Sequence, residues 1–302
     1  MVTTKRTGRT VAETPLPLVR RLLGAADETE VLVGGQALSV WIVKYGLQLT
    51  TDLPVIARAT DFLTQSAVAT ASVEKFARAI NGKASFPRRL DLTALVGQVE
   101  LVISDESYIN VDVIFRIIGL DPAKVLARAV RVELPGSTTF LVMHPFDLLK
   151  SRLANLHELR EKQNNKGVAQ LRLGIDVARA YIQEQAAHYL PAETGAGRSP
   201  IQSLVTEIEK LAIDDAGRKV AKRWGVHVAD AIDPSLIPTG AFWTRKWPTL
   251  KALMSAQYAL GFTAPDSTSA AAKKAARRRS CEAPPRPTTS VGGATARFDR
   301  PG

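Results

Sequence analysis

The hydrophobic pattern of this chain changes near residue 143, and the change predicts two structurally different parts. Before it, short β-rich segments bounded by turn residues alternate with segments of helical periodicity. Beyond it, apolar residues recur at helical spacing in long amphipathic runs. The expected strands cover residues 30–33, 55–62, 98–103, 109–114 and 138–143. Helices are expected at residues 15–26, 66–80 and 122–129, then twice between residues 148 and 182, and at 201–211, 216–224 and 250–260. The sequence therefore predicts an α/β (α+β) domain followed by an α-helical domain.

Four segments are expected along the 302 residues. Residues 1–14 are polar and predict a flexible N-terminus. Residues 15–143 form the α/β domain, and residues 144–263 form the helical domain. Residues 264–302 are rich in Ala, Pro, Ser, Thr and Arg and contain almost no large apolar side chains, so they cannot bury enough surface to fold alone. We expect a disordered basic tail there.

Charge and composition narrow the class of partner. The net charge is +11, and a basic balance favours polyanions such as RNA, DNA or nucleotide phosphates. One cysteine, Cys281, excludes an internal disulfide framework and a multi-cysteine zinc site. No apolar run approaches the roughly 20 residues that span a bilayer, and no apolar segment follows the basic N-terminus as in a secretory signal. We expect a cytoplasmic bacterial protein without a membrane contact.

A strand that delivers two glycines into a helix is the first candidate site. Gly34 and Gly35 follow the apolar run at residues 30–33, and helical periodicity begins directly after them. Glycine lets the backbone approach a ligand closely, and a helix N-terminus is electropositive, so the geometry suits phosphate. A tight turn without a ligand would produce the same pattern.

Two aspartates interrupt predicted strands. Asp61 lies in one strand and Asp112 in another, and an acidic residue in a sheet needs a reason. If the strands are neighbours, the two carboxylates could hold Mg²⁺ over a nucleoside triphosphate, whose phosphates supply further oxygen ligands.

These motifs together resemble a known family. Residues 33–41, VGGQALSVW, look like the glycine motif of the polymerase-β-type nucleotidyltransferase superfamily, in the bacterial branch that includes AbiEii-type abortive-infection toxins. In that branch a strand with two aspartates one residue apart follows, and a third aspartate lies on a later strand. Asp61 matches the second and Asp112 the third, whereas Ala59 stands at the first. Residues 143–156 also resemble the helix that begins the helical part of the branch, and the resemblance covers about residues 29–190.

The resemblance implies a nucleotidyltransferase-like mixed sheet with flanking helices. It further implies Mg²⁺-dependent transfer of a nucleotide from an NTP to an RNA (tRNA) or protein acceptor, in a toxin-antitoxin or phage-defence setting with a cognate antitoxin as partner. Asp61 and Asp112 would be the catalytic and metal-binding residues. The expected nucleotide-binding residues are Gly34, Gly35, Gln36, Thr60 and Lys150, with Arg152 beside Lys150 as a further cation.

Ala59 leaves alternatives open. Without the first aspartate, a two-metal transfer is compromised, and Asp52 could replace it only through an unusual loop conformation. The chain could then be a one-metal enzyme or a nucleotidyltransferase fold kept as a nucleotide- or nucleic-acid-binding module. A helical nucleic-acid-binding protein is the third alternative, since Trp243 and Trp247 flank two basic residues. Aromatic anchoring of a loop explains these tryptophans equally.

Overall fold

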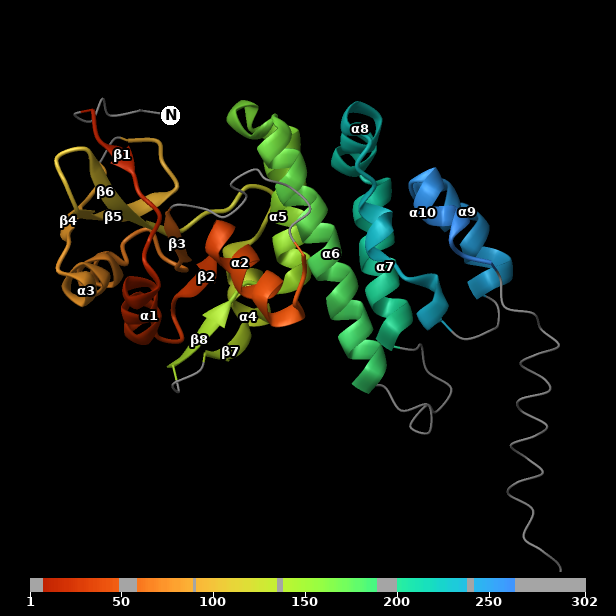
Figure 1. Cartoon of the computed structure of the whole chain (residues 1–302), viewed down its shortest axis with the longest axis horizontal. Coiled ribbons are helices and arrows are strands. Elements are labelled where there is room, and N and C mark those ends of the chain that lie inside the picture. The colour runs from red at the N-terminus through yellow and green to blue at the C-terminus, as the bar shows by residue number, and fades with distance from the viewer. Residues whose placement is uncertain are drawn as a thin grey trace, which may run out of the picture. The chain divides into compact units, whose positions relative to one another are not determined.

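The computed structural model describes residues 8–48, 59–88, 91–134, 138–188, 200–237 and 242–263 (Figure 1). Within these ranges eight strands form one mixed sheet, in the order β4-β5-β6-β3-β2-β8-β7, with β1 paired to β6 off this path. The strands are β1 Thr10–Val11, β2 Val31–Val33, β3 Thr60–Leu63, β4 Lys83–Ser85, β5 Leu95–Val102, β6 Ser107–Ile114, β7 Val130–Leu134 and β8 Thr138–Val142. The pairs β1–β6, β2–β8 and β3–β6 are parallel, and the other pairs are antiparallel.

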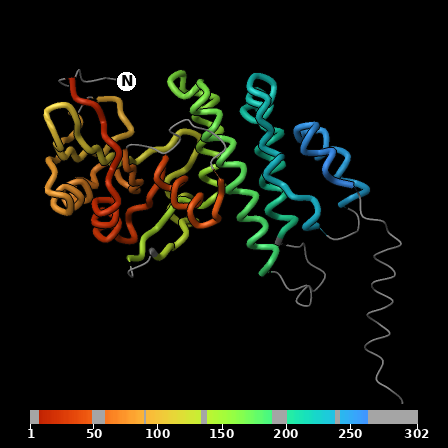
Figure 2. Tube along the Cα trace, viewed as in Figure 1, coloured from red at the N-terminus to blue at the C-terminus, as the bar shows by residue number. Residues whose placement is uncertain are grey.

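Among the described residues, four helices accompany the strands and six follow them. The first four are α1 Leu16–Ala25, α2 Gly34–Tyr45, α3 Thr70–Ile80 and α4 Pro122–Arg128. The later ones are α5 Pro145–Glu158, α6 Asn165–His188, α7 Pro200–Ile213, α8 Asp215–Trp224, α9 Trp247–Leu253 and α10 Ala256–Leu260, and α5 and α6 lie side by side (Figure 2). Short 3₁₀ turns lie at η1 Arg160–Lys162, η3 Val228–Ala231 and η4 Pro234–Leu236, and a π-helical turn at η5 Phe242–Lys246. This order confirms the expected fold class: a mixed sheet with flanking helices, then an α-helical part.

Two hydrophobic clusters hold these elements. The first joins the sheet to α1, α2 and α3, and the second lies among α5 to α10. Residues 1–262 nevertheless form one compact unit, because Leu148 of α5 and Leu173 of α6 belong to the first cluster. The buried indole N–H of Trp41 in α2 also donates to the Met143 carbonyl at 2.9 Å. The change of pattern at residue 143 therefore separates two cores within one packed unit.

Several expected boundaries shift in the structure. Thr10 and Val11 pair with β6, so the flexible N-terminus expected over residues 1–14 does not include them. The helix expected at residues 66–80 begins at Thr70. The helix expected at residues 250–260 is interrupted, because Ser255 has an extended backbone and its N–H donates to Asp230 Oδ1 at 2.9 Å. The tail expected over residues 264–302 lies outside the described residues.

Trp243 and Trp247 lie in the second core. They are 8% and 7% exposed, and the Trp243 indole N–H donates to the Ile237 carbonyl at 3.1 Å. The burial of both rings favours their role as aromatic anchors of the surrounding loop over the stacking of nucleic-acid bases. None of the helices in the described ranges combines the length and the apolar character that a bilayer span needs.

Candidate functional site

The parallel pair β3–β6 brings the two predicted aspartates together. Asp61 and Asp112 occupy the same register position on the two strands, and side chains at one register position project from the same face of a sheet. Both are partly buried. Burial, and then the negative charge of Asp112, raise the pKa of Asp61 to about 7. Two ionised carboxylates this close in a partly buried place repel each other, so a positive charge between them or beside them would stabilise the pair.

The glycine turn touches this carboxylate pair directly. Val33 pairs with Asp61 across the antiparallel β2–β3 register, so the chain leaves β2 at the level of the aspartates. Gly34 has a φ of +69°, and a Cβ at this position would overlap Oδ2 of Asp61. No side chain caps the first turn of α2, so the first N–H groups of this helix have no intrahelical partner. Gly35 and Gln36 are buried in that turn.

Two amides that the sequence analysis missed orient Asp112. Gln98 Nε2 donates to Asp112 Oδ1 at 2.7 Å, and Asn110 Nδ2 donates to the same oxygen at 2.8 Å. Gln98 lies opposite Asp112 in the antiparallel β5–β6 pair, and Asn110 lies two residues before it on the same face of β6. Because strand side chains alternate between faces, the sequence of β6 alone places Asn110 on the same face as Asp112. The position of Gln98 beside Asp112 follows only from the pairing of β5 with β6.

Arg152 supplies a buried positive charge at the cluster. It comes from α5 and is 6% exposed, and its Nε and Nη2 have no hydrogen-bond partner among the described residues. Burial lowers its pKa to about 10, while the charge of Asp61 acts in the opposite direction. A guanidinium held out of water without partners is costly. The guanidinium lies close enough to Asp61 for each charge to shift the pKa of the other group.

The other predicted nucleotide-binding residues take different positions. Lys150 lies two residues before Arg152 on α5 and is exposed, and its charge acts on Asp147. Thr60 is fully buried on the opposite face of β3 from Asp61, because successive strand residues alternate, and its hydroxyl has no partner there. Neither side chain joins the carboxylate cluster. Ala59 directly precedes β3 and brings no carboxylate, and Asp52 lies outside the described residues.

The donor set suits a metal that arrives with a polyphosphate. Within the described ranges, no three His, Cys, Asp or Glu side chains gather as a metal site. Mg²⁺ is usually bound through one or two carboxylates plus substrate phosphates and water. Asp61 and Asp112 are two such carboxylates, and the turn at Gly34 and the guanidinium of Arg152 both lie near Asp61.

A second charged cluster joins α4, α5 and α7. Arg128 Nη1 lies 2.8 Å from Glu207 Oε1 and 3.3 Å from Asp147 Oδ1. His144 is the N-cap of α5, where its Nδ1 accepts from the Phe146 N–H at 3.1 Å. Burial, and then the charge of Arg128, lower the pKa of His144 to about 3. The histidine is therefore neutral near pH 7, and its role in the structure is to begin α5.

Comparison with known proteins gives only distant matches. No protein-family model matches the chain, and no curated protein matches it significantly. The Megavirus polyadenylate synthase structure is 13% identical with a TM-score of 0.36, over 66% of this chain and 36% of that one. The antibiotic-resistance factor ANT(2'')-Ia is also 13% identical, with a TM-score of 0.35, over 57% of this chain and 91% of that one.

Proposed function

We propose that this chain is a nucleotidyltransferase-like protein that binds a nucleoside triphosphate with Mg²⁺ at the Asp61–Asp112 pair. The proposal rests on the position of this carboxylate pair, which lies beside two groups that suit a phosphate. Gly34 lies against the Asp61 carboxylate, and the buried guanidinium of Arg152 has unpartnered N–H groups. Anionic and cationic groups in one partly buried place fit a ligand that carries both signs, namely a metal-bound triphosphate.

Each residue of the cluster has a distinct role in this proposal. Asp61 and Asp112 hold the Mg²⁺, and the first turn of α2 and Arg152 contact the phosphates. When bound, Mg²⁺ neutralises the triphosphate and polarises it toward attack. An acceptor hydroxyl forms a bond to the α-phosphorus, the bond to pyrophosphate breaks, and the hydroxyl proton passes to Asp112. Gln98 and Asn110 orient that carboxylate through their hydrogen bonds.

The acceptor and the biological setting belong to the same proposal. The motif at residues 33–41 and the positions of Asp61 and Asp112 support the AbiEii-like bacterial branch. An RNA, in particular a tRNA, or a protein hydroxyl is the proposed acceptor, and a cognate antitoxin is the proposed protein partner.

A non-catalytic binding module on the same fold is the second candidate, and Ala59 favours it. With only two carboxylates, the cluster can hold a metal-bound nucleotide but lacks the residue that bridges two metal ions in the resembled family. This candidate predicts nucleotide binding without transfer.

Calorimetric titration tests the shared part of both candidates. ATP, GTP, CTP and UTP are each titrated with Mg²⁺ into the wild type, Asp61→Asn and Asp112→Asn. Asp105→Asn is the matched control, because Asp105 is exposed in the turn before β6. We expect at least one NTP to bind the wild type and the control, and to bind either cluster variant at least about tenfold more weakly, since a charge-assisted metal contact is lost. No binding to the wild type, or equal binding to all four proteins, would refute the proposed site.

Transfer separates the two candidates. The wild type and Ala59→Asp are incubated with each α-³²P-labelled NTP, Mg²⁺ and either total RNA or cell lysate. Label on a macromolecule with the wild type supports the enzyme. Label with Ala59→Asp alone supports the binding module, because the added carboxylate then restores a lost function.

A further inference from the structure

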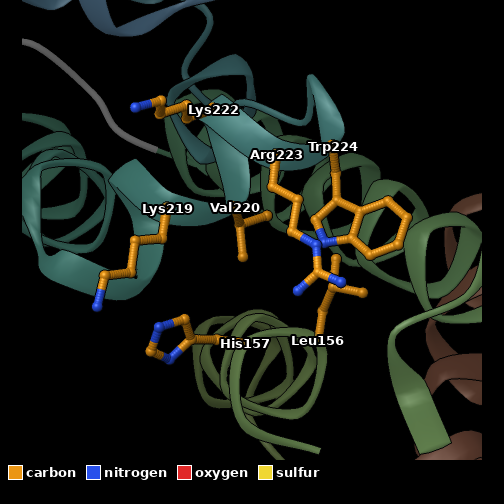
Figure 3. Close-up of a pocket in the computed structure, with 7 residues that line it drawn as sticks. All are labelled: Leu156, His157, Lys219, Val220, Lys222, Arg223 and Trp224. Carbon is orange, nitrogen blue, oxygen red and sulfur yellow. The ribbon is translucent and has the colours of Figure 1, made fainter. Parts of the chain in front are cut away.

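A basic cavity lies where the C-terminal end of α5 meets α8 (Figure 3). Its volume is about 440 Å³, which is large enough for a nucleotide-sized group. Leu156 of α5 and Val220 of α8 are buried at its apolar floor. Its lining residues are Leu156, His157, Lys219, Val220, Lys222, Arg223 and Trp224.

The cationic side chains of the cavity are exposed, and one is fixed in place. Lys219, Lys222 and Arg223 are all solvent-exposed on α8. Arg223 Nη1 donates to Gln163 Oε1 at 3.0 Å, and its guanidinium lies 4.9 Å from the centre of the Trp224 ring. Lys219 forms an exposed ion pair with Asp215 at 2.8 Å, so Asp215 offsets part of the positive charge and Lys222 and Arg223 supply the rest. A concentrated positive field of this kind attracts polyanions.

The cavity is connected to the carboxylate cluster through one helix and one turn. Arg152 and His157 both lie on α5, and five residues of helix rise only about 7.5 Å. The next turn, η1, carries Lys162, whose positive charge lowers the pKa of Asp61. Gln163 follows directly and holds Arg223. Lys162, which acts on Asp61, and Gln163, which holds Arg223, are thus adjacent residues that link the carboxylate pair to the cavity on α8.

We propose that this cavity binds the phosphodiester backbone of a single-stranded nucleic acid, with the strand running past Lys162 of η1 toward Asp61. Basic side chains combined with an aromatic ring are typical of single-strand binding sites, whereas a cavity of this size does not admit a duplex. The role of the bound strand as acceptor rests on the proposed function, whereas the binding of the strand to the cavity is independent of that function.

Salt-dependent binding of a labelled strand tests the proposal. Fluorescein-labelled RNA and DNA strands of about 12 nucleotides and identical sequence are titrated with the full chain by fluorescence anisotropy, between about 50 and 200 mM salt. The cavity variant carries Lys219→Gln, Lys222→Gln and Arg223→Gln. The matched control carries Arg20→Gln, Arg21→Gln and Arg78→Gln, which remove three exposed charges from α1 and α3.

We expect the cavity variant to bind at least about tenfold more weakly at about 100 mM salt and the salt slope to fall by about two, since each single-strand phosphate contact contributes about 0.7. The control should change affinity less than about threefold. Equal losses in the two variants, or wild-type affinity in the cavity variant, would overturn the proposal. Circular dichroism and the thermal midpoint establish folding, and the single exposed change Lys222→Glu provides a second measurement if the triple variant unfolds.

The two nucleic acids and the NTP titration separate the outcomes. Equal binding of RNA and DNA supports recognition of phosphate, and preference for RNA supports the same surface with an added ribose contact. If the wild type binds no NTP but its nucleic-acid binding depends on the cavity, the proposed function fails and the binding surface stands. If NTP binding is intact and the cavity variant binds nucleic acid normally, only this inference fails.

Discussion

Replacing Gly34 by alanine should disrupt the carboxylate cluster far more than the small size of the added methyl group suggests. Gly34 has a φ of +69°, and the added Cβ would overlap Oδ2 of Asp61 and come within 3.0 Å of its Cγ. The positive φ alone costs an alanine about 1–2 kcal/mol. Forcing a side chain into occupied space adds about 1–3 kcal/mol. We therefore expect Gly34→Ala to lower the free energy of unfolding by about 2–5 kcal/mol.

Gly46→Ala is the matched control at the other end of the same helix. Gly46 has a φ of +60°, and a Cβ there would meet nothing within 4 Å. The control thus carries the backbone cost of about 1–2 kcal/mol without the collision. Urea unfolding of the wild type and the two variants, followed by circular dichroism, measures both losses. Equal losses within about 0.5 kcal/mol would show that Gly34 does not lie against Asp61 as described.

The same pair of variants has a functional readout. If Gly34→Ala displaces the Asp61 carboxylate, Mg²⁺-dependent NTP binding should be lost in that variant and kept in Gly46→Ala. A stable Gly34→Ala protein with unchanged NTP affinity would contradict the proposed contact of this turn with the phosphates.

Four further substitutions test the electrostatics. Because the folded-state pKa of Asp61, about 7, lies above its ordinary value of 3.8, its protonated form favours folding below about pH 4, and this contribution is lost as the pH rises through 7. Asp61→Asn should therefore raise the urea midpoint at about pH 8 by an amount that shrinks toward pH 4; parallel pH profiles would be contrary evidence. Lys75→Met should lower the free energy of unfolding by about 3–5 kcal/mol in urea, because the Glu30 carboxylate would lose its cation. This carboxylate is 1% exposed and lies 2.7 Å from Lys75 Nζ. A loss below about 1 kcal/mol would argue against the buried pair. Arg152→Met should abolish NTP binding in calorimetry with little loss of stability, whereas Lys150→Met should keep it; the reverse result would assign the phosphate contact to Lys150.

The core of the candidate site was predictable because it depends on local patterns. The pattern at residues 30–45 predicts a strand, two glycines and a helix, and Asp61 and Asp112 are acidic residues within apolar strands. The proximity of the two aspartates depends on the pairing of their strands, which the sequence suggests but does not determine. Strand alternation alone would have placed Thr60 on the face opposite Asp61.

The remaining contacts depend on tertiary packing. Arg152 and Lys150 are indistinguishable in a helical run of mixed charge, and only the packing of α5 makes one buried and the other exposed. The strand β4, Lys83–Ser85, contains no β-branched residue and exists through its pairing with β5. Basic residues on α8 show amphipathic spacing in the sequence, but their position beside the end of α5 does not follow from it.

The hydrogen bond from Trp41 to the Met143 carbonyl has a mechanical consequence. Trp41 lies two turns beyond Gly34 on α2, and Met143 immediately precedes the cap of α5, the helix that carries Arg152. A rigid indole thus joins the helix that begins at Gly34 to the start of the helix that carries Arg152. Tilting either helix would strain this hydrogen bond, so the scaffold itself fixes the spacing between the two helices.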